Sequence, residues 1–191
     1  MASPRGLGSL RKPITLIFNM LKNPETKYKP FYPICLQDRT LPNSRITKSP
    51  KWCSVDLRDV NQALPKPMDI STKTAMFKWI VGLGFNEVEI GYPSASEIEF
   101  GFVRHLIEGG LIPDDVTIQV LTPARAELID RTIQALVGAK SVIIHLYNGV
   151  GPAQRKSVFK CTEDGVIELA VQGVLRIQSQ LCQLSGTEFT L

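Results

Sequence analysis

Four strand-like segments alternate with four helix-like segments after residue 51, and this alternation limits the fold more than any other feature of the chain. The strand-like runs are short, largely apolar, and begin near residues 52, 87, 116 and 141. Each is followed by a segment whose apolar residues recur at helical spacing. Consecutive strand–helix units predict parallel strands joined by right-handed crossovers. Either an open doubly wound sheet or a TIM barrel satisfies this prediction.

Capping signals predict where the helices begin. A side-chain oxygen before a helix can accept a hydrogen bond from the exposed backbone N–H groups of its first turn, and proline is tolerated at the first helical position. The predicted starts are Asp69 or Ser71, Ser96 with Glu99 at capping-box spacing, Thr122 with Pro123, and about Glu163. We expect the last helix to run to about Leu181 with one inward face: Ile167, Ala170, Val171, Val174 and Leu175.

Two further signals concern the type of sheet. No G-x-G-x-x-G motif follows the first strand-like run, which argues against the dinucleotide-binding form of the open sheet. Residues 187–191 resemble the start of a fifth strand.

Composition excludes several classes of protein. A chain of 191 residues with 43% hydrophobic content can bury one sizeable core. The net charge of +4 comes from scattered basic residues, so a nucleic-acid surface is not predicted. Every apolar run is too short to span a membrane. The four cysteines lack C-x-x-C spacing, so we expect reduced thiols rather than a zinc or redox motif.

The N-terminal quarter of the chain differs in amino-acid composition from the rest. Residues 1–24 carry four basic and no acidic side chains, as in a mitochondrial transit peptide, although an untargeted flexible leader also fits. A mitochondrial and a cytoplasmic location are therefore both open. Residues 23–50 hold five prolines, which predicts an extended arm over about 25–51.

The segment Trp52–Gln62 brings an arginine and a carboxylate to the end of the first strand-like run. In parallel α/β proteins the carboxyl ends of the strands share one mouth, where the chemistry is placed. Arg58 and Asp59 are therefore candidates for handling substrate and metal. The alternative is a local ion pair that only fixes a loop.

Several motifs, in order along the chain, resemble 2-isopropylmalate synthase, in particular its fungal-type form. The likeness covers roughly residues 20–185 and rests on six runs: KYKPF at 27–31, DRTLPN at 38–43, WCSVDLRDVNQAL at 52–64, GYPSAS at 91–96, IPDDVTIQVLT at 112–122 and HLYN at 145–148. The resemblance implies a TIM-barrel catalytic domain that condenses acetyl-CoA with 2-oxoisovalerate in leucine biosynthesis. It also implies a divalent metal, Mg, Mn or Zn, chelated by the 2-oxo acid.

Six residues match functional positions of that family. Arg58 matches the catalytic arginine, and Asp59 matches the metal-binding aspartate. Four more match substrate-binding positions: Gln62, Glu89, His145 and Tyr147. Two of them have a structural alternative. Glu89 could be a hydrogen-bond acceptor inside the barrel, and His145 could be a core histidine whose hydrogen bonds are made within the protein.

The chain departs from the family pattern in two ways. Val60 stands where the family has glycine, so we expect the loop with Asp59 to be displaced if that position needs positive φ. A whole TIM barrel takes about 250 residues, so residues 52–191 predict only its N-terminal half. We expect an α/β fold, a partial TIM (β/α)8 barrel with about four β/α units and the start of a fifth strand, preceded by an irregular arm.

The metal ligands of the family include an H-x-H motif, which the histidines at 105 and 145 do not form. The sequence therefore predicts weak metal binding and no activity by the chain alone. Two alternatives stay open. The chain is then either a non-catalytic partner that assembles with a full-length homologue, or a diverged paralogue that uses another 2-oxo acid.

Overall fold

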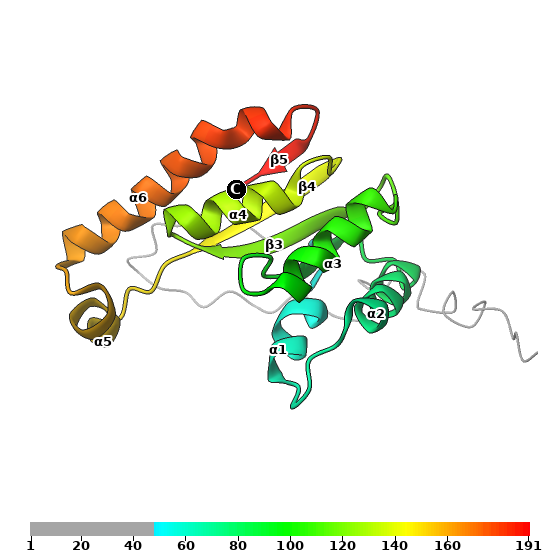
Figure 1. Cartoon of the computed structure of the whole chain (residues 1–191), viewed down its shortest axis with the longest axis horizontal. Coiled ribbons are helices and arrows are strands. Elements are labelled where there is room, and N and C mark those ends of the chain that lie inside the picture. Colours follow the sequence, from blue (N-terminus) through cyan, green and yellow to red (C-terminus); the bar gives the residue numbers. More distant parts are fainter. Residues whose placement is uncertain (1–47) are drawn as a thin grey trace, which may run out of the picture. The chain divides into compact units, whose positions relative to one another are not determined.

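The computed structural model describes residues 48–191, and its second compact unit, Pro50–Leu191, has an α/β fold (Figure 1). The strands of this unit are β1 (Cys53–Ser54), β2 (Glu87–Gly91), β3 (Thr117–Pro123), β4 (Ser141–Tyr147) and β5 (Glu188–Thr190). Its long helices are α2 (Ile70–Gly82), α3 (Glu97–Glu108), α4 (Ala126–Leu136) and α6 (Glu163–Gln180). Short helical segments are η3 (Asp56–Val60), α1 (Asn61–Ala63), α5 (Pro152–Gln154), η4 (Arg155–Phe159) and η5 (Leu181–Leu184).

The order of the strands decides between the two predicted sheet types. The described strands form one sheet in the order β1-β2-β3-β4-β5, and every neighbouring pair is parallel. A doubly wound sheet reverses direction at a switch point, whereas strictly sequential order with crossovers of one hand places all the helices on one face. Consecutive helices accordingly pack on each other, α2 on α3, α3 on α4 and α4 on α6. The fold is an open, partial barrel, as predicted.

The core lies between this helical layer and one face of the sheet. In β3 and β4 alternate residues are buried against the helices, because successive side chains of a strand point to opposite faces. Ile118 pairs with Val142 and Val120 with Ile144, so the parallel register brings the inward residues of the two strands side by side. On the opposite face Thr117 and Ser141 share a hydrogen bond of 3.0 Å. Among the described residues the long helices α2, α3, α4 and α6 lie on the other face, and the helical turn η3 packs against β2.

Two of the predicted helix starts are confirmed by their hydrogen bonds. The Asp69 carboxylate accepts from the backbone N–H of Thr72 at 2.8 Å. The Ser96 hydroxyl accepts from the N–H of Glu99 at 3.2 Å. These caps are local, and both helices begin at the residue after the cap.

The predicted start at Thr122 and Pro123 is wrong. Both residues belong to β3, where they pair with Leu146 and Tyr147 of β4. Helix α4 begins at Ala126, after Arg125. Pairing with the neighbouring strand extends β3 past a local helix signal, and the Thr122 side chain is fully buried.

The inward face predicted for α6 is also wrong in part. Ile167, Val171 and Leu175 are exposed, Ile167 by 62%. The buried residues of this helix are Val166, Gly173 and Ile177. A Cβ on Gly173 would lie 3.0 Å from Ala124 Cβ and 3.3 Å from a Leu146 methyl carbon. The helix therefore contacts the sheet closely along its glycine face, and the adjacent aliphatic stripe stays outside.

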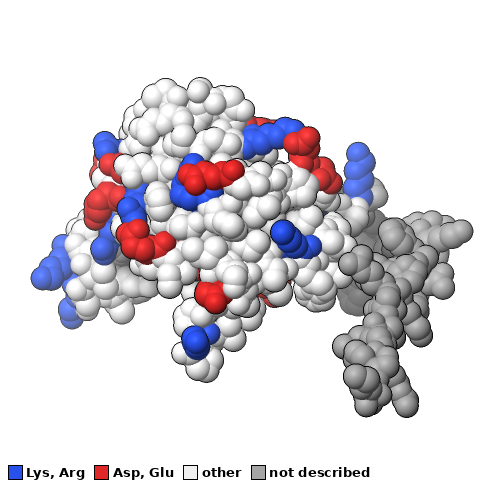
Figure 2. Space-filling view, turned by 45° about the vertical axis from the view of Figure 1, so that its right-hand side comes forward, with Lys and Arg blue, Asp and Glu red and all other residues white. Residues whose placement is uncertain are grey.

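The remaining expectations concern the ends and the surface. The leader at 1–24 and most of the arm at 25–51 lie outside the described residues. Within 48–191 no helix combines the length and the apolar character needed to cross a membrane. Trp52 and Trp79 are both exposed. Figure 2 shows lysine and arginine interspersed with aspartate and glutamate on the visible face.

Candidate functional site

A helical turn follows β1 and carries the first two candidate residues. Arg58 and Asp59 lie in the π-helical turn η3, where a loop was expected. Leu57 is fully buried and anchors the turn in the core. Val60 has ordinary helical torsions, φ −68° and ψ −40°, so the expected conflict between a β-branched side chain and positive φ does not arise.

Glu89 is the centre of the polar network on the face of the sheet opposite the long helices. Its side chain is fully buried, and the residue lies in the middle of β2. Arg58 Nε donates to one carboxylate oxygen at 2.9 Å, and His145 Nδ1 lies 2.8 Å from the other. Three elements far apart in sequence, η3, β2 and β4, thus meet at one carboxylate.

The charge of Glu89 follows from these contacts. Burial alone would raise its pKa, but hydrogen bonds from His145, Gln119 and Arg58 outweigh burial and hold the pKa of this carboxyl below its ordinary value. Glu89 is therefore ionised at neutral pH and only accepts hydrogen bonds, so His145 Nδ1 carries the hydrogen between them. This arrangement leaves His145 Nε2 for a ligand.

Gln119, which was not among the residues predicted from the sequence, also belongs to this network. The Gln119 amide lies 3.5 Å from His145 Nδ1 and also helps to stabilise the Glu89 carboxylate. Its Oε1 lies 4.0 Å from the Cys53 thiol. A lone amide inside an otherwise apolar strand was the available signal, because a polar residue there needs a partner.

Asp59 sits at the edge of the network. Its side chain is 57% exposed and forms an ion pair with Arg58. Among residues 48–191 no three His, Cys, Asp or Glu side chains are grouped closely enough to hold a metal ion. A catalytic transition metal normally has about three protein ligands. The described residues by themselves therefore do not fit a metal centre.

The other two candidates lie outside the hydrogen-bonded group. Gln62 is exposed in α1, and within the described residues its side chain has no hydrogen-bond partner. Tyr147 is 44% exposed at the end of β4, on the same face as His145. Tyr92 and Tyr147 line one cavity, and burial, with a smaller effect of Tyr147, raises the pKa of Tyr92.

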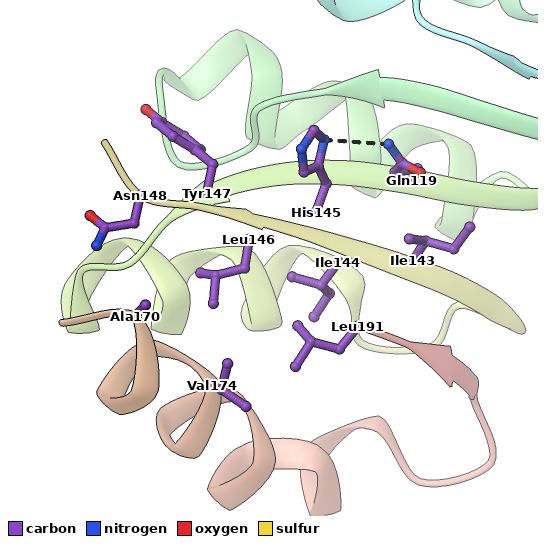
Figure 3. Close-up of a pocket in the computed structure, with 10 residues that line it drawn as sticks. All are labelled: Gln119, Ile143, Ile144, His145, Leu146, Tyr147, Asn148, Ala170, Val174 and Leu191. Carbon is purple, nitrogen blue, oxygen red and sulfur yellow. Dashed lines mark hydrogen bonds between the residues drawn. The ribbon is translucent and has the colours of Figure 1, made fainter. Parts of the chain in front are cut away.

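Two cavities open beside these residues. One, of about 360 Å³, lies where β3 and β4 end and is lined by Tyr92, Arg125 and Tyr147 together with residues of α5 and η4. The other, of about 530 Å³, follows β4 beyond its last pair with β5. In Figure 3 His145 and Tyr147 lie on one side of β4, whereas Leu146 lies on the other side, toward α6.

The second cavity lies along β4. β5 pairs with β4 only from Ser141 to Ile143, although β4 continues to Tyr147. The space beside the rest of β4 is lined mainly by apolar groups, among them Ala170, Val174 and Leu191 (Figure 3). This cavity lies beside the part of β4 that β5 does not pair with, and the smaller cavity lies at the carboxyl ends of β3 and β4.

Comparisons with known proteins agree with this architecture. Residues 49–189 match the HMGL-like family. The 2-isopropylmalate synthase of Ralstonia pickettii is 52% identical over 171 residues, which are 90% of this chain and 30% of that protein. That of Rhodospirillum rubrum is 50% identical over 168 residues, 88% of this chain and 30% of that protein. That of Parafrankia sp. is 55% identical over 150 residues, 78% of this chain and 26% of that protein.

The chain thus spans 26–30% of the length of these three curated relatives. The match covers β1 to β4, the first two residues of β5 and the network at Glu89. The parallel order of the strands is what the first part of a TIM barrel requires. On these grounds the chain belongs to the HMGL-like family.

Proposed function

We propose that this chain forms the N-terminal part of a 2-isopropylmalate synthase barrel, which condenses acetyl-CoA with 2-oxoisovalerate in leucine biosynthesis. The observation that carries the proposal is the convergence of Arg58 and His145 on the buried Glu89 carboxylate. Identity of about 50% to proteins named 2-isopropylmalate synthase supports the same choice.

Arg58 is the group proposed to stabilise negative charge on the substrate. Its Nε bonds to Glu89 and its Nη1 to Asp59, whereas Nη2 has no partner among the described residues. A guanidinium fixed at two nitrogens can direct the third at an oxygen whose charge increases as the new carbon–carbon bond forms. Fixing the donor beforehand avoids reorganisation during the reaction.

His145 and Tyr147 are proposed to bind the 2-oxo acid, with Gln62 at the mouth. Because Glu89 occupies His145 Nδ1, Nε2 is the nitrogen that can bond to a carboxylate or ketone oxygen. Tyr147 follows two residues later on the same face and lines the mouth cavity. Its phenol supplies a further hydrogen bond.

Asp59 is proposed as one ligand of a divalent metal in the complete site. By itself it is a weak ligand, because it is exposed and already paired with Arg58. We therefore expect the 191-residue chain to bind Mn²⁺ only weakly and to release no thiol from acetyl-CoA above background. Robust metal-dependent turnover with 2-oxoisovalerate by the purified chain would contradict this expectation.

Binding can be tested separately from turnover. We expect 2-oxoisovalerate to shift the NMR resonances of the His145 ring and the Tyr147 ring, and Arg58→Gln to weaken this effect. Arg104→Gln is a matched control, because Arg104 lies on α3 and bonds to Glu108. A series of other 2-oxo acids in the same titration tests for a diverged paralogue, which would prefer another member of the series.

A second candidate function follows from the open edge of β4. An unpaired parallel edge beside an apolar groove can accept a strand from another chain. The chain would then assemble with a full-length homologue and act as its interaction partner. We expect the chain to co-purify with that homologue. A chain that stays monomeric and does not bind the homologue would exclude this second function.

A further inference from the structure

A buried ion pair lies next to the polar network but makes no direct contact with it. Lys73 of α2 is fully buried, and its ammonium group lies 2.7 Å from Glu99 Oε1 of α3. The same nitrogen lies over the Phe102 ring, 4.5 Å from its centroid. Burial lowers the pKa of Lys73, and the bond to Glu99 opposes this effect.

The Glu99 carboxylate also holds two backbone segments. Its Oε1 accepts from the Asn61 amide at 3.4 Å, and its Oε2 accepts from the backbone N–H of Tyr92 at 3.1 Å. Asn61 is three residues after Arg58, and its own backbone N–H donates to the Arg58 carbonyl. Tyr92 is three residues after Glu89. One carboxylate therefore connects the segments that carry the two members of the Arg58–Glu89 pair.

The sequence leaves space for this arrangement at Gly91. A Cβ on Gly91 would collide with Glu99 Oε2 and lie 3.2 Å from the Lys73 ammonium nitrogen. The pairing of β2 with β3 is also irregular between Glu89 and Gly91. Bulges of this kind redirect side chains next to functional sites. The carboxyl end of β2 is thus shaped around the ion pair.

Stability alone does not explain why a fully buried ammonium group is paired here with a carboxylate whose side chain is only 16% exposed. Replacing a buried ion pair with well-packed apolar residues is often neutral or stabilising, because desolvation offsets the attraction. A carboxylate with two oxygens can instead orient two segments at once. Asn61 adds a second anchor for the turn, since its side-chain oxygen Oδ1 accepts a hydrogen bond from the backbone N–H of Met68 at 2.8 Å.

We propose that the Lys73–Glu99 pair positions Arg58 against Glu89 by fixing the turn at 56–63 and the end of β2. Lys73 and Glu99 act through Asn61 and the Tyr92 backbone and touch no substrate. This positioning role rests on the proposed function only because the proposed function makes Arg58 the substrate-binding group. The test of the positioning role needs no substrate, so the positioning role and the proposed function can fail independently.

The test uses Lys73→Met in the full chain, with Lys78→Met as control. Lys78 lies on the same helix but is exposed. In Lys73→Met we expect Arg58 to leave Glu89, so the NMR titration midpoint of the Glu89 carboxyl should rise toward the ordinary glutamate value. The amides of 57–61 should exchange about tenfold faster, a factor that corresponds to about 1.4 kcal/mol. Lys78→Met should match the unmodified chain in both measurements.

Glu99→Gln is the second variant, because an amide of the same shape keeps the packing and removes the charge. It should shift both readouts in the same direction and decides the matter if Lys73→Met does not fold. A purely structural pair would lower overall stability and leave the Glu89 midpoint where it is. An unchanged midpoint together with unchanged exchange at 57–61 in a folded variant would overturn the proposal.

Discussion

At the scale of single residues, the site depends on buried charges that neutralise each other. Glu89 is fully buried and keeps its charge because Arg58 and His145 bond to it. Removing one member of a buried pair is costly, because the other charge is left without a partner. Glu89 should therefore matter for stability as well as for the site.

Glu89→Gln tests this dependence through pH. Hydrogen bonds hold the pKa of folded Glu89 below its unfolded value, so ionised Glu89 stabilises the fold above the unfolded pKa, and this stabilisation is lost as pH falls through the folded pKa. We expect the variant to lose about 3 kcal/mol at neutral pH and to lose less than the unmodified chain on acidification. Urea unfolding at neutral pH and at about pH 3, followed by circular dichroism, measures both effects.

Asp114→Asn is the control for this experiment. Its carboxylate also has a lowered pKa, because Lys140 bonds to it, but it is exposed at the surface. We expect its stability at neutral pH to be close to that of the unmodified chain. Neutral-pH stability of Glu89→Gln equal to that of Asp114→Asn would argue against a buried, paired Glu89.

Gly91→Ala tests the space that the ion pair needs. The added methyl group would meet Glu99 Oε2, which the Tyr92 backbone and Lys73 hold in place. We expect a loss of about 1–3 kcal/mol, as for other overpacked sites. Gly82→Ala is the control, since nothing lies within 4 Å of the position of its Cβ. Equal stabilities of the two variants in thermal unfolding would contradict the prediction.

At the scale of elements, helix α6 shows how packing selects one face of an apolar helix. Its aliphatic residues surround much of the helix, but only the side with Gly173 comes close to β3 and β4. The exposed stripe at Ile167, Val171 and Leu175 adds little to the core. Side chains on the two sides of α6 should therefore contribute very different amounts to the free energy of unfolding.

The same substitution on the two sides measures this difference. Ile177→Ala removes a fully buried side chain and should cost about 2–5 kcal/mol. Ile167→Ala removes an exposed one and should change stability by about 0.5 kcal/mol or less. Denaturant unfolding of both variants gives the comparison. A larger loss for Ile167→Ala would mean that the sequence-based face of α6 is the buried one.

At the scale of the whole molecule, the open sheet leaves an apolar groove along β4. Such an edge favours association with another chain. We expect the apparent mass of the chain to rise with its concentration in analytical ultracentrifugation. Leu191→Lys should weaken this association, because Leu191 lines the groove and is itself half exposed. Val171→Lys, on the exposed stripe of α6, is the control.

The opposite result is that Leu191→Lys leaves the association unchanged and Val171→Lys abolishes it. That result would place the contact on α6 instead of the β4 edge. The same pair of variants can be carried into the co-purification experiment with a full-length homologue. There too, the charge at residue 191 is expected to weaken assembly, because a lysine in an apolar groove must be desolvated.

The sequence by itself determined the features that a few neighbouring residues encode. The caps at Asp69 and Ser96 need only the adjacent turn, and β4 occupies the whole of the predicted run 141–147. Strand ends and family motifs together pointed to Arg58, Glu89 and His145, which the structure brings into contact. The catalytic and binding roles of these residues stay predictions.

Only the tertiary structure decided what depends on residues far apart in the chain. The sequential strand order, the strand pairing of Thr122 and the inward face of α6 all follow from neighbours many positions away. Gln119 and the Lys73–Glu99 pair likewise acquire their partners only when helices and strands pack. The physical reason is that a cap or an alternation is satisfied within one turn or strand, whereas a buried charge is satisfied only by the whole fold.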